Sequence, residues 1–102
     1  MLLSKAKFYR ETDQLTSFYA QSLTHPARLE ILRSLRQQDL MSVNEMAFRH
    51  PISLPAVSQH LEILRKKNLI QYQPQFPFLL YSLNQVDYEK ARHCLIQFLN
   101  EI

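Results

Sequence analysis

Glycine is absent from all 102 residues of the sequence. Glycine is the residue that most easily takes a positive backbone φ angle, and it builds the loops that hold phosphate groups in nucleotide-binding enzymes. Tight turns in this chain must therefore use asparagine, aspartate or other residues, and a glycine-rich anion loop is excluded. The sequence also has no nucleophile motif and no convincing pair of catalytic carboxylates. We therefore expect that the protein is not an enzyme.

Cysteine is nearly absent as well, since Cys94 is the single one. One thiol cannot form an internal disulfide or a cysteine-cluster zinc site, and we expect Cys94 to act as a small hydrophobic residue near the packing face of the last helix. No apolar run approaches the roughly 20 residues that a membrane-spanning helix needs. The first residues lack the layout of a secretory signal peptide. These absences predict a cytoplasmic protein without a membrane partner.

The residues that are present suit one globular domain. Hydrophobic residues make up 46% of the chain, which is too many for a disordered protein. A chain of this length has room for one core and not for a second, so we expect residues 1–102 to form a single domain. The formal net charge is +3 and the pI is near 9.2. A basic chain suits a polyanionic partner, although total charge alone does not identify one.

The first part of the sequence predicts two helices. Apolar residues recur at helical spacing over about residues 5–23. Thr24 is a suitable N-cap and Pro26 is well tolerated in a first turn, so a second helix starts here and continues to about residue 37. Arg28 shares the apolar stripe of this second helix, and we expect its guanidinium to anchor neighbouring backbone carbonyls.

Two shorter helices follow. Ser42 and Glu45 have the spacing of a capping box, which opens a third helix that stops before Pro51. Ser53 can cap a fourth helix with Pro55 in its first turn. Because only a few residues separate them, the two helices must cross, so that the third braces the fourth as in a helix-turn-helix.

The fourth helix has an apolar inner face and a polar outer face. The inner positions are spaced by four and three residues: Val57, Leu61 and Leu64. The remaining face carries side chains that can exchange hydrogen bonds with base edges: Ser58, Gln59 and His60. Cations that can neutralise phosphates follow toward the end of the helix: Arg65, Lys66 and Lys67.

The remaining chain predicts a hairpin and a last helix. Asn68 can take the left-handed conformation that ends the fourth helix. Two strand-like runs span residues 69–73 and 78–83, and residues 74–77 form the tip between them because their prolines cannot continue a helix. A final helix covers about residues 86–102. The predicted fold class is mainly α with a small β-hairpin, in the order helix, helix, helix, helix, strand, strand, helix.

Three stretches of the sequence resemble the ArsR family of winged-helix repressors. They are LTHPARLEIL at residues 23–32, ISLPAVSQHLEIL at 52–64, and the segments NLI at 68–70 and YSL at 81–83, which lie at the two ends of the hairpin. The resemblance covers about residues 23–83, in the order and spacing of the family. It implies a winged helix-turn-helix domain that binds double-stranded DNA. It also implies a sequence-specific transcriptional regulator of repressor type, acting as a homodimer on an operator with two-fold symmetry.

The resemblance also implies two sets of site residues. DNA contact is expected from the fourth helix and its N-terminal boundary, at Ser53, Leu54, Ala56, Ser58, Gln59, His60, Arg65, Lys66 and Lys67. Members of the family dimerise through their first and last helices, here residues 1–23 and 85–102. The apolar residues of these segments are therefore expected at a dimer surface: Leu15, Phe18, Tyr19, Ala91, Leu95, Phe98, Leu99 and Ile102.

The sequence departs from the family pattern at four places. Leu54 replaces a residue that is usually polar, Pro51 replaces a glycine, and Phe76-Pro77 replace a Gly-Arg pair at the wing tip. Residues 69–83 contain no Lys or Arg, so the wing can gain little phosphate attraction. We expect the apolar tip to pack within the protein rather than against a partner. The alternative function is a winged-helix protein-interaction module that has lost DNA binding, and a contiguous exposed patch at the tip would favour it.

No metal and no other cofactor is expected. The Cys-x-Cys pair that some relatives carry in the third helix is absent from residues 42–46. Asp87, Glu89 and His93 are candidate ligands in the last helix, but the histidine pair expected later in that helix is missing. What switches the regulator therefore stays open, with a small organic molecule, a protein partner or no effector as the alternatives.

Overall fold

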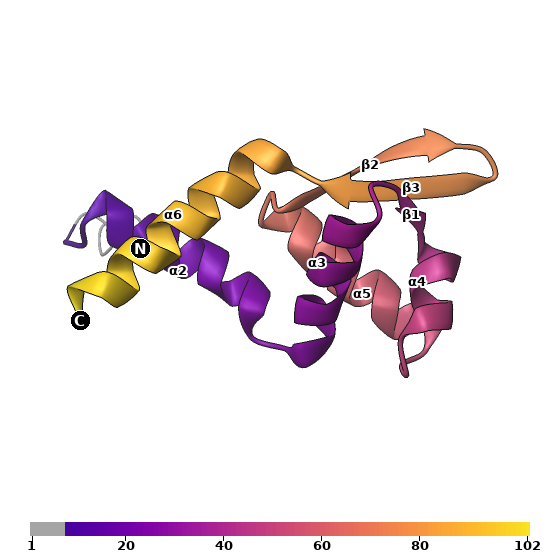
Figure 1. Cartoon of the computed structure of the whole chain (residues 1–102), viewed down its shortest axis with the longest axis horizontal. Coiled ribbons are helices and arrows are strands. Elements are labelled where there is room, and N and C mark those ends of the chain that lie inside the picture. Colours follow the sequence, from indigo (N-terminus) through magenta and orange to yellow (C-terminus); the bar gives the residue numbers. More distant parts are fainter. Residues whose placement is uncertain (1–7) are drawn as a thin grey trace.

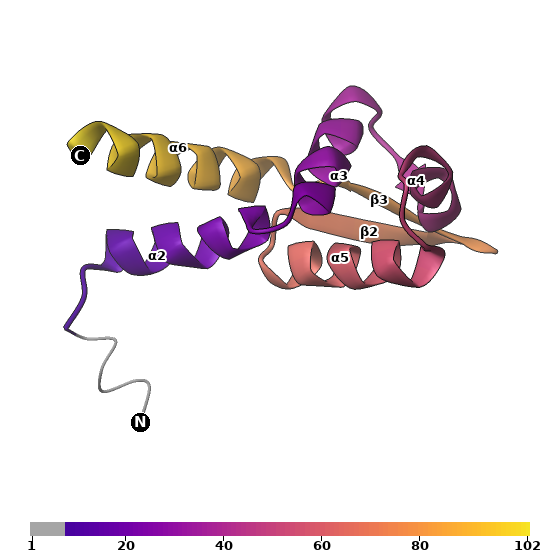
Figure 2. The same ribbon diagram turned by 90° about the horizontal axis from the view of Figure 1, so that it is seen from below.

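The computed structural model of the chain describes residues 8–102. Two parts are visible in Figures 1 and 2. Helices α2 and α6 lie side by side at one end, while α3, α4, α5 and a small sheet form a body at the other. Helix α2 spans Glu11–Ala20 and continues as a short 3-10 helix, η1, at Gln21–Leu23. Helix α6 spans Gln85–Glu101, so the first and last described helices are neighbours that lead away from the body.

Helix α2 is shorter than the sequence predicts. Residues 5–7 lie outside the described residues, and residues 8–10 are not helical. The side chains of Phe8 and Tyr9 are 82% and 65% exposed, so little packing offsets the entropy of ordering another helical turn. The helix begins where Glu11 and Asp13 place carboxylates at the positive end of the helix dipole.

Helix α3 (Pro26–Gln37) has the predicted extent, but its N-cap is His25 and not Thr24. The Nδ1 of His25 accepts a hydrogen bond from the backbone N–H of Ala27 at 3.0 Å. The hydroxyl of Thr24 instead accepts from the guanidinium of Arg28 at 2.5 Å. The Thr24 hydroxyl is therefore occupied by the side chain of Arg28, one helical turn away, and the N-cap is the next residue, His25.

Helix α4 (Val43–Arg49) confirms the predicted capping box. The Ser42 hydroxyl accepts from the N–H of Glu45 at 3.2 Å. The Glu45 carboxylate accepts from the N–H of Ser42 at 3.1 Å. The capping box thereby satisfies two backbone N–H groups at the start of this short helix, those of Ser42 and Glu45.

Helix α5 (Leu54–Lys66) also has its predicted caps. The Ser53 hydroxyl accepts from the N–H of Ala56 at 3.3 Å. Asn68 follows the helix with a φ of 63°, which is the left-handed conformation predicted for a residue that takes the usual place of glycine.

The sheet has three strands, where the sequence predicts a two-stranded hairpin. Strands β2 (Ile70–Gln75) and β3 (Phe78–Leu83) pair in an antiparallel way. Strand β1 (Met41–Ser42) pairs with the other side of β3, so the order is β1-β3-β2. A strand of two residues is too short to produce an alternating pattern in a sequence. The fold is therefore mainly helical with a three-stranded antiparallel sheet.

The hairpin tip is tighter than predicted. Pro74 lies within β2, paired with Leu79, so that Phe76 and Pro77 alone form the turn. Strand β2 is at the edge of the sheet, where a proline that lacks an N–H need not break the hydrogen-bonded ladder. The placement of Pro74 in the turn was therefore wrong, because an edge strand tolerates the residue that otherwise marks a loop.

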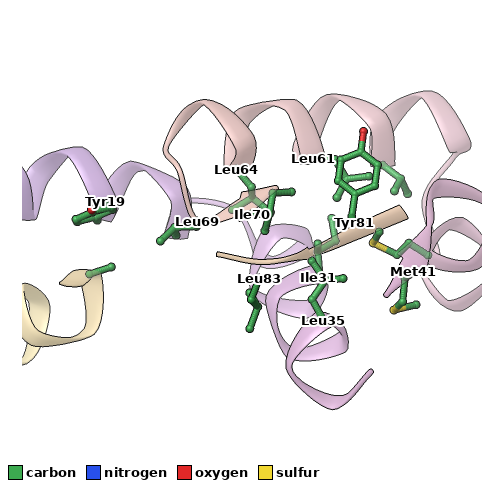
Figure 3. Close-up of a cluster of buried hydrophobic side chains, with 13 residues drawn as sticks. Tyr19, Ile31, Leu35, Met41, Leu61, Leu64, Leu69, Ile70, Tyr81 and Leu83 are labelled. Carbon is green, nitrogen blue, oxygen red and sulfur yellow. The ribbon is translucent and has the colours of Figure 1, made fainter. Parts of the chain in front are cut away.

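One core joins α3, α5 and the sheet, and Figure 3 shows its side chains. The predicted inner positions of α5 are 0% exposed: Val57, Leu61 and Leu64. Tyr19 of α2 and Ala91 of α6 extend the same cluster toward the helix pair. Within residues 8–102, every helix falls short of the length and apolar content that crossing a bilayer requires.

Candidate nucleic-acid interface

Helix α5 presents one face to the core and the opposite face to solvent. In Figure 2 it forms an edge of the body, with α3 and the sheet on its other side. Helix α4 packs against α5, as the predicted helix-turn-helix requires. The side chains of Ser58 and Gln59 are exposed on the outer face. Neither has a hydrogen-bond partner among the described residues, so both are free to bind an external group.

The start of α5 is apolar and open to solvent. Leu54 is 45% exposed in the first turn. Ser53 is also exposed, but it is the N-cap residue and its hydroxyl accepts the capping hydrogen bond from Ala56. Ala56 is half-buried beneath this turn. Of these three residues, Leu54 therefore offers the largest apolar surface at the N-terminal end of α5.

His60 does not share the free outer face with Ser58 and Gln59. Its Nδ1 lies 3.0 Å from the Nη1 of Arg28. Its half-buried ring contacts the ring of His25 in a tilted arrangement, with centroids 4.4 Å apart and an interplanar angle of 46°. A guanidinium has only donors, so Nδ1 must be the acceptor and the neutral ring carries its proton on Nε2. Burial lowers the pKa of His60, with smaller contributions from the charges of His25 and Arg28. Only the Nε2–H edge of this residue is left to meet another molecule.

Arg28 connects the helix pair's end to α5. It is buried, and its Nε donates to the carbonyl of Ser22 at 3.1 Å. Its Nη2 donates to the Thr24 hydroxyl at 2.5 Å, with a longer contact of 3.4 Å to the carbonyl of Gln21. The prediction that Arg28 anchors neighbouring carbonyls is confirmed. The same guanidinium also fixes the ring of His60, which periodicity along one helix could not reveal.

Three cations lie at the C-terminal end of α5, with Lys67 as its C-cap, and they differ in how freely they can bind a phosphate. Arg65 binds the carboxylate of Glu62 through two hydrogen bonds of 2.9 and 2.5 Å. The Arg65 hydrogen bonds lower the pKa of Glu62, which keeps the pair charged. Lys67 lies over the ring of Phe18 at 4.4 Å. Lys66 is exposed and has no ion pair within the described residues.

The wing extends from the body as an apolar, exposed tip. Phe76 is 91% exposed, and Phe78 and Leu79 are 49% and 40% exposed. The prediction that this tip packs within the protein is therefore wrong for Phe76, because a two-residue turn at the end of the hairpin extends beyond the body (Figure 1). The sequence pattern could not predict the exposure of Phe76, because the residues of an apolar tip are the same whether the tip packs on the body or extends into solvent.

A hollow of about 270 Å³ lies between α4, the start of α5 and the wing. Leu54 and Ser58 line it from α5, and Pro77, Phe78 and Leu79 line it from the wing. In the sequence, Leu54 and the apolar tip are separate departures from the family pattern. The structure brings them together on two walls of one hollow.

The predicted dimer residues fall into two groups. Tyr19 and Ala91 are buried within the single chain, at 2% and 4% exposure, so they have little surface left for a partner. The Tyr19 hydroxyl donates to Asp87 at 2.9 Å and thereby joins α2 to α6. Burial and this hydrogen bond raise the pKa of Tyr19 to about 12.

The other members of that set keep surface on the helix pair. Phe18 and Leu95 are half-buried, and the exposed ones are Leu15, Phe98, Leu99 and Ile102. Ile96 is also exposed on α6, although the apolar stripe read from the sequence did not include it. The described residues 8–102 therefore leave an apolar surface on the helix pair uncovered.

The described residues contain no group of three or more His, Cys, Asp or Glu side chains placed to hold a metal ion. Asp87 is occupied by its bond to Tyr19, while Glu89 and His93 are exposed on α6. Cys94 is a free, half-buried thiol.

Comparisons with known proteins agree on one group. Residues 25–72 match the family model described as bacterial regulatory protein, arsR family. The chain is 30% identical over 80 residues to the transcriptional repressor SdpR of Bacillus subtilis, a match that covers 78% of this chain and 88% of that protein. Among solved structures, NolR from Sinorhizobium fredii has a TM-score of 0.69 at 28% identity, covering 86% of this chain and 87% of that one. HlyU from Vibrio cholerae has a TM-score of 0.70 at 25% identity, covering 79% and 89%.

Proposed function

Since the chain belongs to the ArsR family of bacterial transcriptional regulators, we propose that it is a repressor that binds double-stranded DNA sequence-specifically as a homodimer. Its described residues form one winged helix-turn-helix body with a helix pair, and we propose that residues 1–102 act as one DNA-binding domain. Two copies would present their α5 helices to successive major grooves of an operator with two-fold symmetry, roughly one helical turn apart.

The observation that carries this proposal is the outer face of α5. Ser58 and Gln59 are exposed and have no hydrogen-bond partner among the described residues. A glutamine side chain can donate to and accept from an adenine edge, and a serine hydroxyl can serve either role. A helix braced from behind by a packed core holds such groups in a fixed register, which sequence discrimination requires. We therefore assign base contact first to Gln59 and Ser58.

Phosphate contact is assigned to the margins of α5. Lys66 is exposed and without an ion pair in the described chain, so it meets a phosphate at no cost in broken contacts. Arg65 and Lys67 are partly held by Glu62 and Phe18, and they contribute less unless DNA displaces those contacts. His60 contributes through its Nε2–H, in the orientation that Arg28 sets. With few free cations, affinity should depend less on salt than for a wing rich in arginine.

The homodimer is proposed to form through the helix pair. Apolar surface on α2 and α6 is left uncovered by the described residues of the single chain, at Leu15, Phe98, Leu99 and the C-cap Ile102. Burying such surface between two copies is favourable, at about 25 cal/mol per Å². Tyr19 and Ala91 support this surface from within the subunit rather than contacting the partner.

The test is selection of bound duplexes from a random DNA pool by the purified chain, repeated with Gln59→Ala. We expect an enriched motif with two-fold symmetry, and a changed or weakened preference at symmetric positions for the variant. Gln37→Ala is the matched control, because Gln37 is an exposed glutamine at the end of α3, away from α5. An enriched motif that is identical for all three proteins would exclude base contact by Gln59.

A protein-interaction module that has lost DNA binding is the second candidate function. The exposed tip formed by Phe76, Phe78 and Leu79 favours it, because apolar groups gathered on a surface often mark a protein contact. Under this function a folded dimer would enrich no duplex at any salt concentration. Replacement of Phe76 by Ser would then reduce partner binding and leave the fold unchanged.

A further inference from the structure

The hollow between α5 and the wing has a chemistry that differs from an ordinary phosphate-binding surface. Its lining contains no charged side chain and is mainly apolar, although polar residues from α4 and α5 also take part: Val43, Leu54, Pro77, Phe78 and Leu79, with Ser42, Asn44 and Ser58. The wing strands carry no Lys or Arg, so the hollow has nothing to neutralise a phosphate. An apolar group is the occupant that its walls would hold most favourably.

Three polar side chains lie among these apolar walls: Ser42 and Asn44 at the start of α4, and Ser58 of α5. The Ser42 hydroxyl is occupied by the capping box of α4, where it accepts from the N–H of Glu45. Ser58 lines the hollow one helical turn after Leu54, on the same side of α5. Its hydroxyl has no partner among the described residues. The hollow therefore combines an apolar wall with a hydrogen-bonding group about one turn away along the helix.

Thymine is the base whose major-groove edge has this combination. It presents a C5-methyl group directly beside the O4 acceptor, and the other bases have no methyl group there. We infer that Leu54 contacts a thymine methyl in each operator half-site while the Ser58 hydroxyl donates to O4 of that base. This inference rests on the proposed DNA binding and adds the identity of the base that the start of α5 reads.

The position of the hollow favours DNA over a protein as its occupant. Ser58 belongs both to the hollow and to the outer face of α5, so the hollow is continuous with the proposed base-reading surface. Leu54 lies in the first turn of α5, and residues near the N-terminal end of a recognition helix contact base edges in helix-turn-helix complexes. A protein partner remains the competing outcome of the test.

Deoxyuridine provides the sharpest probe, because it differs from thymidine only by the missing methyl group. One thymine and its symmetry mate are replaced by deoxyuridine at a time, and affinity is measured for the chain of residues 1–102 at fixed salt. Losing one buried methyl weakens binding about fourfold, so a symmetric pair weakens it about fifteenfold. The effect should occur at one pair of positions, and 5-methylcytosine there should bind more tightly than cytosine.

Leu54→Ala identifies the protein group that reads the methyl. This variant should bind thymidine and deoxyuridine duplexes with less than about a twofold difference. Alanine suits a first helical turn, and Leu54 is half exposed, so the helix is retained. Leu40→Ala is the matched control, since Leu40 is 39% exposed in the loop before β1. The Leu40→Ala variant should still bind the deoxyuridine duplex about fifteenfold more weakly than the thymidine duplex.

The outcomes separate this inference from the proposed function. An enriched motif whose affinity is unchanged by deoxyuridine at every position overturns the inference and leaves DNA binding standing. A deoxyuridine penalty that persists in Leu54→Ala also overturns it, because another residue then reads the methyl. If no duplex is enriched at all, both fail, and the hollow is left to a protein partner.

Discussion

The Arg28→Met substitution would remove the guanidinium that joins η1, α3 and α5. Methionine keeps much of the apolar length, so the main loss is hydrogen bonding. Three bonds lie within 3.1 Å, to the Ser22 carbonyl, the Thr24 hydroxyl and the His60 Nδ1. At about 1 kcal/mol for each, the free energy of unfolding should fall by about 3 kcal/mol.

Urea unfolding followed by circular dichroism measures this loss. Arg33→Met is the control, because Arg33 is an exposed arginine of the same helix whose ion pair with Glu30 lies at the surface. Exposed pairs of this kind contribute up to about 1 kcal/mol. A fall of less than 1 kcal/mol for Arg28→Met, or equal falls for the two variants, would refute the view that Arg28 is a structural anchor.

The same variant should change the titration of His60. Burial is the largest cause of its lowered pKa, and the charges of His25 and Arg28 add to it. Removing the guanidinium removes one of these causes, so the pKa should rise toward the ordinary value for histidine. Titration of the imidazole by NMR measures this shift. A pKa that stays the same or falls would contradict the contact between Arg28 and His60.

Three further predictions concern the core, the helix pair and the dimer. Leu61→Ala should lower the free energy of unfolding by about 2–5 kcal/mol, because it opens a cavity at a fully buried position; a urea titration that gives less than 1 kcal/mol would argue against this core. The pKa of Tyr19 is raised in the folded protein, so on raising the pH the phenol ionises in the unfolded chain before it does in the folded one. The contribution of Tyr19 to the free energy of unfolding is therefore fully present below pH 10 and is lost as the pH rises toward about 12. Stability measured across that window should fall less steeply for Tyr19→Phe, and identical curves would count against the buried phenol. Leu99→Glu should convert the proposed dimer to a monomer in sedimentation equilibrium with an unchanged helix content, since Leu99 is 64% exposed in the single chain. A dimer that persists in this variant would remove Leu99 from the proposed interface.

Local patterns predicted most of the fold because its elements are specified by short-range chemistry. The capping box of Ser42 and Glu45, the Ser53 cap and the left-handed Asn68 each depend on residues close in the chain. The inner face of α5 follows from spacing alone. These features can be read from the sequence because the residues that decide them are neighbours.

The features that sequence reasoning missed depend on contacts between distant segments. Strand β1 exists because it pairs with β3, about 40 residues later in the chain. His60 turns toward Arg28, which lies on another helix, and so it differs from Gln59 beside it. Tyr19 is buried by its contact with α6, although its position in α2 suggested an outer surface. One-dimensional periodicity assigns a face to each residue but not the element that covers that face.

The departures from the family pattern are where the structure added most to the sequence. Leu54 and the tip residues Phe78 and Leu79 are far apart in the chain and line the same hollow. These departures therefore lie at one site of the structure rather than at several separate ones. These residues can be identified as departures from the family pattern in the sequence, but their proximity can be seen only in the structure.

The central claim, that the outer face of α5 reads DNA sequence, is tested most directly by a discrimination ratio. Affinity is measured by fluorescence anisotropy for a selected duplex and for a shuffled duplex of equal composition, at one salt concentration. We expect the unmodified chain to prefer the selected duplex by at least about a thousandfold. Gln59→Ala should lose about tenfold to a hundredfold of that preference, while Gln37→Ala keeps it. Equal affinity of the folded, unmodified protein for the two duplexes would contradict the claim.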